Sequence, residues 1–217
     1  MGSKLKYALA SMLFISFNAN SAVITDLFNT GVDNAGNALS GNVVADSHYD
    51  ITAHSAFGVS LLGDAFTVGS GFPIGPWVGN SSDSRWIGTG QNSSNGPLTL
   101  TFSTTFTLGL DADLSSVSIS ALGGVDDVLA GINLNGVSTG VTFSGFTSLT
   151  SFSINSGFVH GINTLDFNVL NSGGGPTGLR IKNIEGTYEA VPEPSIIALM
   201  GIGLAGLGFA RRRKQKV

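Results

Sequence analysis

A few residues have the chemical types that catalysis uses, but their spacing does not suit it. Ser138 lies between Gly136 and Gly140 in the Gly-x-Ser-x-Gly pattern. That pattern marks a nucleophile only where a strand turns into a helix, and here strands are expected on both sides. Asp126 and Asp127 are adjacent, and neighbouring strand residues point to opposite faces, so they are not expected to flank a glycosidic bond. The three histidines show no metal-ligand spacing. The sequence predicts that the protein is not an enzyme.

Three aromatic residues are candidates for binding a carbohydrate. Trp77 and Trp86 lie in a stretch rich in proline, serine and asparagine, and Tyr49 precedes it in the chain. Their ring faces are of the kind that pack against sugar rings. Tryptophan is, however, highly buried on average, so both tryptophans are expected first as core residues beneath a long loop.

Alternating apolar and polar residues predict the strands that position these side chains. The alternation is clearest over residues 98–108 and recurs over 117–121 and 163–170. Asn135-Gly136 is typical of a tight hairpin turn, and a break in phase near Asn183 indicates a β-bulge. No segment of the body keeps a helical period. These patterns predict an all-β domain over residues 23–189, an antiparallel β-sandwich or jelly roll.

Composition limits the classes of partner. The chain has 217 residues, no cysteine, and only 11% charged residues. Three basic and fourteen acidic residues lie between Asp26 and Glu193, a net charge of 3 − 14 = −11. Nucleic-acid binding relies on lysine and arginine contacts with phosphates, so this balance predicts no nucleic-acid partner.

The N-terminus has the features of a secretory signal peptide, predicted over residues 1–22 as a signal helix. Lys4 and Lys6 precede an apolar run over residues 7–17, and small residues follow up to Ala22. This order is the one that signal peptidase cleaves.

The C-terminal residues 190–217 have three parts in order. Residues 191–195 form a proline-rich hinge, residues 196–210 an apolar run, and residues 211–216 a basic stop. The sequence predicts a single transmembrane helix over 196–210 with its basic end in the cytoplasm. A plain membrane anchor is the alternative interpretation. The basic cluster consists of Arg211, Arg212, Arg213 and Lys214.

This tail resembles the PEP-CTERM sorting signal in Val191, Pro192, Glu193 and Pro194, the apolar run and the terminal arginines. The resemblance implies export by a Gram-negative bacterium and processing by an exosortase. It also implies an inner-membrane precursor and a final place at the cell surface or in the medium.

The body is similar to a domain common in PEP-CTERM proteins, a sandwich of the carbohydrate-binding-module or galactose-binding type. The likeness rests on short elements such as Pro76-Trp77, Arg85-Trp86-Ile87 and residues 161–167. Related sandwiches often carry a structural calcium ion held by loop carboxylates and carbonyls. The candidate ligands for such an ion are Asp33, Asp126 and Asp127; no other cofactor is expected.

Two hypotheses about function follow. The first is a structural protein of the cell surface or extracellular matrix, associated with exopolysaccharide. The alternative is a carbohydrate-binding module that binds an extracellular polysaccharide. An exposed Trp77 or Trp86 beside side-chain amides would favour the alternative.

Overall fold

The computed structural model describes residues 20–191, apart from residues 57, 59, 70, 72, 91 and 92, together with Gly203. The chain divides into two units, one of which is Ser21–Val191. The predicted signal helix lies outside the described residues, as does all of the predicted transmembrane helix except Gly203. No helix among the described residues is long and apolar enough to cross a membrane.

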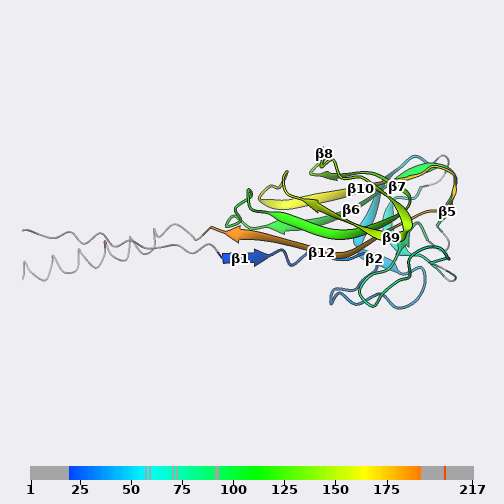
Figure 1. Cartoon of the computed structure of the whole chain (residues 1–217), viewed down its shortest axis with the longest axis horizontal. Helices are drawn as coiled ribbons and strands as arrows, with labels where there is room; N and C mark the ends of the chain where they lie inside the picture. Colours follow the sequence, from blue (N-terminus) through cyan, green and yellow to red (C-terminus); the bar gives the residue numbers. More distant parts are fainter. Residues whose placement is uncertain are drawn as a thin grey trace, which may run out of the picture. The chain divides into compact units, whose positions relative to one another are not determined.

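The described part of the body consists of strands and loops (Figure 1). The all-β prediction therefore agrees with the structure. The strands are β1 (Asn20–Val23), β2 (Ala45–His54), β3 (Gly63–Thr67), β4 (Ile87–Gly88), β5 (Ser94–Asn95), β6 (Leu98–Leu108), β7 (Ser118–Leu134), β8 (Val137–Ser138), β9 (Phe143–Ile154), β10 (Gly161–Asn171), β11 (Gly175–Pro176) and β12 (Gly178–Ala190).

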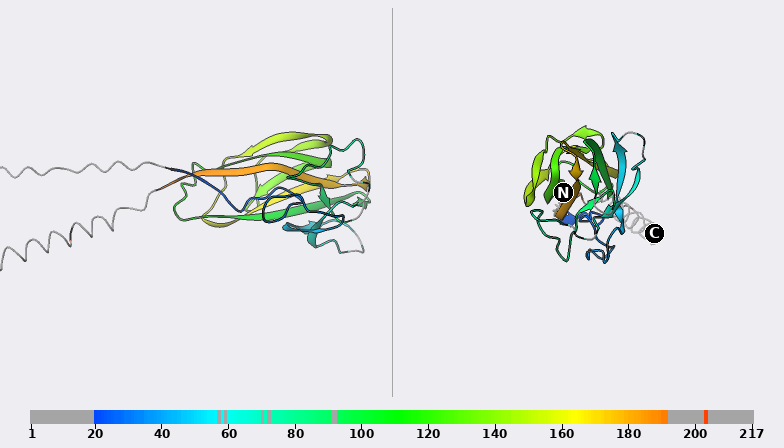
Figure 2. Two further views of the ribbon diagram at one scale, coloured as in Figure 1. Left: turned by 90° about the horizontal axis from the view of Figure 1, so that it is seen from below. Right: turned by 90° about the vertical axis from the view of Figure 1, so that its right-hand side faces the viewer.

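The predicted sandwich or jelly roll is wrong, because the main strands form one closed barrel instead of two separate sheets. Hydrogen-bonded neighbours follow one another in the order β12, β4, β3, β2, β6, β10 and β7, and β7 pairs again with β12. The end-on view of Figure 2 looks along these strands. Strands β1, β8 and β9 add to this ring, whereas β5 and β11 pair only with each other.

The long strand β7 closes the barrel because it changes partners along its length. Its first half, from Ser118 to Asp126, pairs with β12. Its second half, from Val128 to Leu134, pairs with β10. Shifts of register interrupt the pairings of β7 with β9 and of β2 with β3 and β6. Such irregularities bend and twist strands, and here they allow the sheet to curve around a single core.

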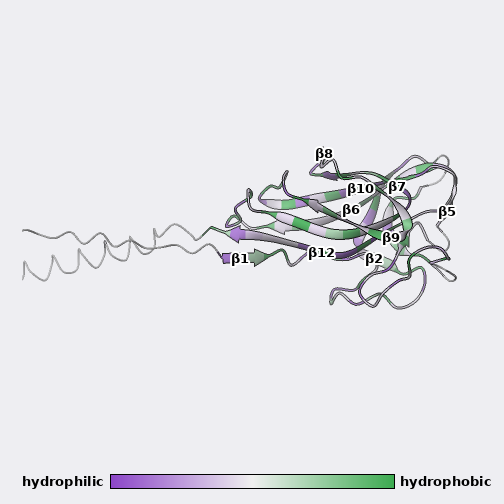
Figure 3. Cartoon of the chain, in the orientation of Figure 1, coloured by the Kyte–Doolittle hydropathy of each residue, from purple (hydrophilic) through white to green (hydrophobic). Residues whose placement is uncertain are grey.

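The core follows the predicted alternation. Along β6, Leu98, Leu100, Phe102, Phe106 and Leu108 are buried, and β10 likewise buries alternate residues. Figure 3 shows hydropathy alternating along both strands. Burying one such side chain contributes roughly 1.5–3 kcal/mol, so these strands supply much of the stability of the barrel.

Two local predictions are confirmed. Asn135 and Gly136 have φ angles of 53° and 79° and join β7 to β8, as a hairpin turn with two left-handed central residues requires. Asn183 has a φ of 52°, and it lies where the register between β12 and β7 shifts. The break in alternation near Asn183 is therefore a bulge.

Candidate functional site

The barrel continues without a linker up to the first residue of the predicted sorting motif. The last strand ends at Ala190, which forms a β-bridge with Ala112. The backbone N–H of Val191 donates to the carbonyl of Asp111 at 2.7 Å, and that of Asp113 donates to the carbonyl of Glu189 at 2.9 Å. Val191 is thus held on the barrel by regular backbone bonds. Pro192, Glu193, Pro194 and the basic cluster at residues 211–214 lie outside the described residues.

The three predicted calcium ligands do not come together as one group. Within the described ranges, no set of three or more acidic, histidine or cysteine side chains is arranged to hold a metal ion. Asp33 is exposed, and its Oδ1 accepts hydrogen bonds from the backbone N–H groups of Ala35 and Asn37, each at 2.9 Å. These bonds, chiefly the one from Asn37, lower the pKa of Asp33. Its carboxylate caps its own turn.

Asp126 and Asp127 form a pair with opposite pKa shifts. Burial, and then a hydrogen bond with the Asp127 side chain, raise the pKa of Asp126 to about 7. The same bond, together with bonds from Ser172, lowers the pKa of Asp127. The expectation that the two side chains point to opposite faces is therefore wrong, because β7 departs from regular pleating at the register shift beside them. The carboxylate of Asp126 accepts from Trp77 Nε1 at 2.8 Å, so the pair fastens a loop to the barrel.

The three predicted sugar-stacking rings are buried. Trp77 is 6% exposed, and Trp86 and Tyr49 are each 1% exposed. The two tryptophans pack on each other with ring centroids 4.4 Å apart, and the hydroxyl of Tyr49 donates to the carbonyl of Phe28 at 2.9 Å. These rings therefore fill the interior. For the two tryptophans, this agrees with the expectation that they are core residues.

A polar pocket that the sequence analysis did not identify lies over β2, β6 and β10. It has a volume of about 470 Å³. Its floor includes a row of three residues on neighbouring strands, because Ser103 is paired with Asp50 on one side and with Asp166 on the other. The pocket is lined by Asp26, Phe28, Ser47, His48, Asp50, Thr52, Ser103, Thr104, Thr105, Thr164 and Asp166.

Hydrogen bonds fix the floor of this pocket. The hydroxyl of Ser103 donates to Asp166 Oδ1 at 2.5 Å, and the hydroxyls of Thr52 and Ser103 lie 2.6 Å apart. At the edge, the Asp26 carboxylate accepts from the backbone N–H of Thr107 at 2.8 Å. Hydrogen bonds therefore hold the side chains of Thr52, Ser103 and Asp166 in place, although Thr52 remains exposed, as does Asp50.

An aromatic pair completes the lining. The rings of Phe28 and His48 are stacked, with centroids 3.6 Å apart and an interplanar angle of 8°. Burial lowers the pKa of His48, which favours the neutral imidazole. The alternation of apolar and polar residues does not predict this pocket, because residues 26–28 belong to the loop between β1 and β2 and not to a strand.

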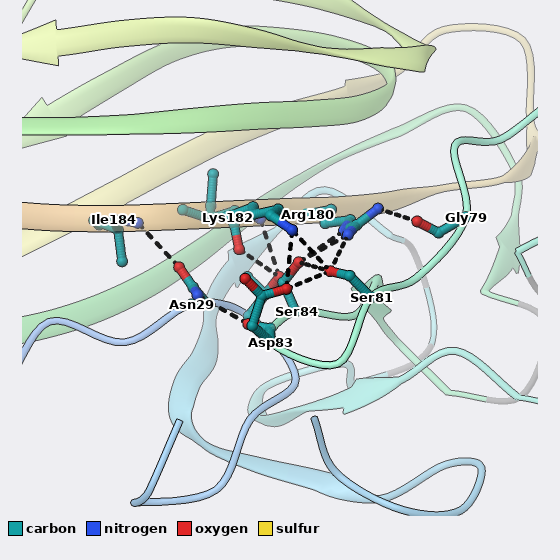
Figure 4. Close-up of polar contacts among 10 residues, drawn as sticks. Asn29, Gly79, Ser81, Asp83, Ser84, Arg180, Lys182 and Ile184 are labelled. Carbon is teal, nitrogen blue, oxygen red and sulfur yellow. Dashed lines mark hydrogen bonds and ion pairs between the residues drawn. The ribbon is translucent and has the colours of Figure 1, made fainter. Parts of the chain in front are cut away.

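The basic side chains of the body lie elsewhere and have structural roles. Arg180 is 2% exposed and donates hydrogen bonds to the Ser81 and Ser84 hydroxyls and to the carbonyl of Gly79 (Figure 4). Lys182 forms an ion pair with Asp83 at 3.0 Å. These two residues of β12 hold the segment that contains Gly79 and Ser84.

The side-chain amide of Asn29 belongs to the same cluster as Arg180 and Lys182. The third basic residue, Arg85, contacts a different loop. Asn29 donates to the carbonyl of Asp83 at 2.8 Å and accepts from the backbone N–H of Ile184 at 3.0 Å (Figure 4). Arg85 donates to the carbonyls of Leu39 and Gly41. No lysine or arginine lines the pocket.

Comparison with known proteins matches the tail. Residues 190–214 match the PEP-CTERM protein-sorting motif. No curated protein matches the chain. The match begins at Ala190, the last residue of β12, and it indicates an exported protein that an exosortase sorts to the cell surface.

Proposed function

We propose that the chain is a structural protein of the bacterial surface or extracellular matrix, associated with exopolysaccharide and released there by exosortase processing at the hinge. The observation that carries this proposal is the position of the sorting motif. The motif begins at residue 190, where β12 ends. A cut beyond Val191 would leave every strand of the described barrel in the released product.

The hinge chemistry supports processing at this point. Proline lacks a backbone N–H and restricts the residue before it to extended conformations. Pro192 and Pro194 therefore favour an extended segment, the form in which a protease binds its substrate as a strand. The bond from Val191 N–H to the Asp111 carbonyl, at 2.7 Å, holds the preceding residue on the body. Glu193 supplies a charge between the two prolines, which we propose as the recognition group.

The test replaces Pro192, Glu193 and Pro194 together by alanine and follows the protein in cell and medium fractions. Wild type is expected to appear at the surface or in the medium in a shortened form, in a host that has an exosortase. The triple variant is expected to stay cell-associated at full length. The control is Glu189→Ala, which removes an exposed carboxylate just upstream without changing the motif.

The exosortase-deficient strain supplies the second comparison. There, wild type and triple variant are expected to behave alike, because neither is processed. Equal release of both proteins in the exosortase-positive strain would falsify the sorting proposal. Retention of the Glu189→Ala variant would show that charge near the junction, and not the hinge sequence, controls release.

The alternative function is carbohydrate binding. The sequence suggested it through three aromatic residues, whereas the structure favours it through the polar pocket. Trp77, Trp86 and Tyr49 are buried and offer no exposed ring face. The polar pocket over β2, β6 and β10 instead combines hydroxyls, carboxylates and an aromatic pair on the surface of the sheet.

A further inference from the structure

We propose that the polar pocket over β2, β6 and β10 binds one sugar unit of a neutral polysaccharide. The inference rests on the proposed function for the presence of extracellular polysaccharide, and it adds a site and a ligand class to it. The pocket is distinct from the sorting hinge and uses none of the aromatic residues predicted from the sequence.

The size and foundation of the pocket suit a small ligand. Its volume of about 470 Å³ falls in the range of roughly 300–1,000 Å³ that small-molecule sites occupy. Its floor is built on three hydrogen-bonded neighbouring strands, and sites on regular elements are held more rigidly than sites on loops. A ligand would therefore meet a floor whose backbone is already in place.

The polar groups match the hydrogen-bonding needs of a sugar. Each sugar hydroxyl both donates and accepts, and an ionised carboxylate accepts only. The carboxylates of Asp50 and Asp166 flank the Ser103 hydroxyl on adjacent strands, which lie about 4.8 Å apart. Thr105 and Thr164, one row along, are also paired across the strands and add two more hydroxyls. The floor thus presents acceptors for several donors of one ligand.

The aromatic pair supplies the apolar part of the site. Phe28 is partly exposed and is stacked on the ring of His48, with centroids 3.6 Å apart. Sugar rings carry C–H groups that pack against apolar surfaces, and apolar contact combined with a few fixed polar groups is the usual pattern of ligand sites. The pair forms a wall beside the polar floor.

Charge selects among the polysaccharides. Asp26, Asp50 and Asp166 all line the pocket, and no basic side chain lines it. The three basic residues between residues 20 and 191 hold other parts of the barrel. A polymer rich in carboxylates would be repelled, since like charges brought together are unfavourable. Because no group of three or more ligand side chains in the described part of the chain suits a metal, a calcium-bridged mode is not favoured either.

The test uses the full chain, purified in mild detergent, on four immobilised glycans: a neutral glucan, a neutral mannan, a neutral galactan and a polyuronate. Each is tested with and without added calcium chloride. The variants Asp50→Asn and Thr105→Val change exposed side chains of the pocket with little change in shape. Glu185→Gln is the matched control, an exposed carboxylate of β12 outside the pocket. Far-UV circular dichroism checks that each variant keeps its strands.

Wild type and Glu185→Gln are expected to bind at least one neutral glycan equally. Asp50→Asn is expected to weaken that binding about ten-fold, because it removes a charged acceptor, and Thr105→Val about three-fold. Three results would overturn the proposal: no binding to any neutral glycan, binding that both pocket variants leave unchanged, or binding only to a polyuronate or only with added calcium chloride. Hinge-dependent release is measured separately in cells, so either proposal can fail while the other holds.

Discussion

Replacing Arg180 by methionine is expected to destabilise the barrel measurably. The guanidinium is buried and donates four hydrogen bonds to Gly79, Ser81 and Ser84. At about 1 kcal/mol net for each bond, their loss costs about 4 kcal/mol. Methionine also removes a charge that is costly to bury, which we take to offset about half. The expected net loss is about 2 kcal/mol, or about 4–8 °C in Tm for a domain of this size.

The matched control is Lys182→Met, two residues along the same strand. Its ion pair with Asp83 spans 3.0 Å, but the two side chains are 25% and 41% exposed. Ion pairs at the surface contribute roughly 0–1 kcal/mol, so the expected decrease in Tm is between zero and about 4 °C. Both variants remove one positive charge from β12, and the difference between them isolates the effect of burial.

The assay is thermal unfolding of the full chain in mild detergent, followed by near-ultraviolet circular dichroism. Trp77 and Trp86, with ring centroids 4.4 Å apart, report on the segment that Arg180 holds. Equal decreases for the two variants, or a Tm that rises in Arg180→Met, would refute the reasoning. Equal decreases would mean that the buried hydrogen bonds of Arg180 contribute no more than a surface ion pair. A raised Tm would mean that the cost of burying the guanidinium exceeds the value of its hydrogen bonds.

Three further predictions use the same unfolding assay. The folded-state pKa of Asp126 is raised to about 7 from 3.8, so the contribution of its protonated form to stability is full below about pH 4 and is lost as the pH rises through 7. The variant Asp126→Asn should therefore reduce the fall in Tm between pH 5 and 8. An unchanged fall in Tm would contradict the raised pKa of Asp126. Gly31→Ala should lower the free energy of unfolding by about 2 kcal/mol or more, because Gly31 has a φ of +68° and the new Cβ would lie 2.6 Å from Cβ of Arg85. The control Gly36→Ala has a φ of +81° but open space around the new Cβ, so it should cost only the conformational part, about 1 kcal/mol. Tyr49→Phe removes a buried hydrogen bond of 2.9 Å and should cost about 1 kcal/mol; no change in Tm would show that the bond contributes nothing net.

Local features of this chain were predictable because they depend on neighbouring residues. Strict alternation over residues 98–108 places every second side chain on one face, and that face is the core. Asn135-Gly136 specifies a turn because few residue pairs tolerate two left-handed conformations. The sorting motif is likewise a linear signal, and residues 190–214 carry it whatever fold precedes them.

The candidate ligand residues were less predictable, because burial and proximity are long-range properties. The average burial of tryptophan favoured the interior for Trp86, and Trp86 is 1% exposed, but no local pattern showed that Tyr49 is buried as well. Nor did any local pattern show that Asp33 caps its own turn instead of joining Asp126. The calcium site stays a prediction without a gathered set of ligands.

The tertiary structure alone decided between a sandwich and a barrel. Alternation requires one buried face for each strand, and both architectures satisfy it equally. The choice depends on β7, whose two halves pair with β12 and β10, partners that are distant in the sequence. The pairing of β6 with β2 and with β10 sets Asp50 and Asp166 on either side of Ser103, and the polar pocket lies over these strands. The sequence by itself determined the strands with strict alternation, the turn, the bulge and the sorting tail. The pairing of distant strands, which no local pattern encodes, determined the barrel and the pocket on its surface.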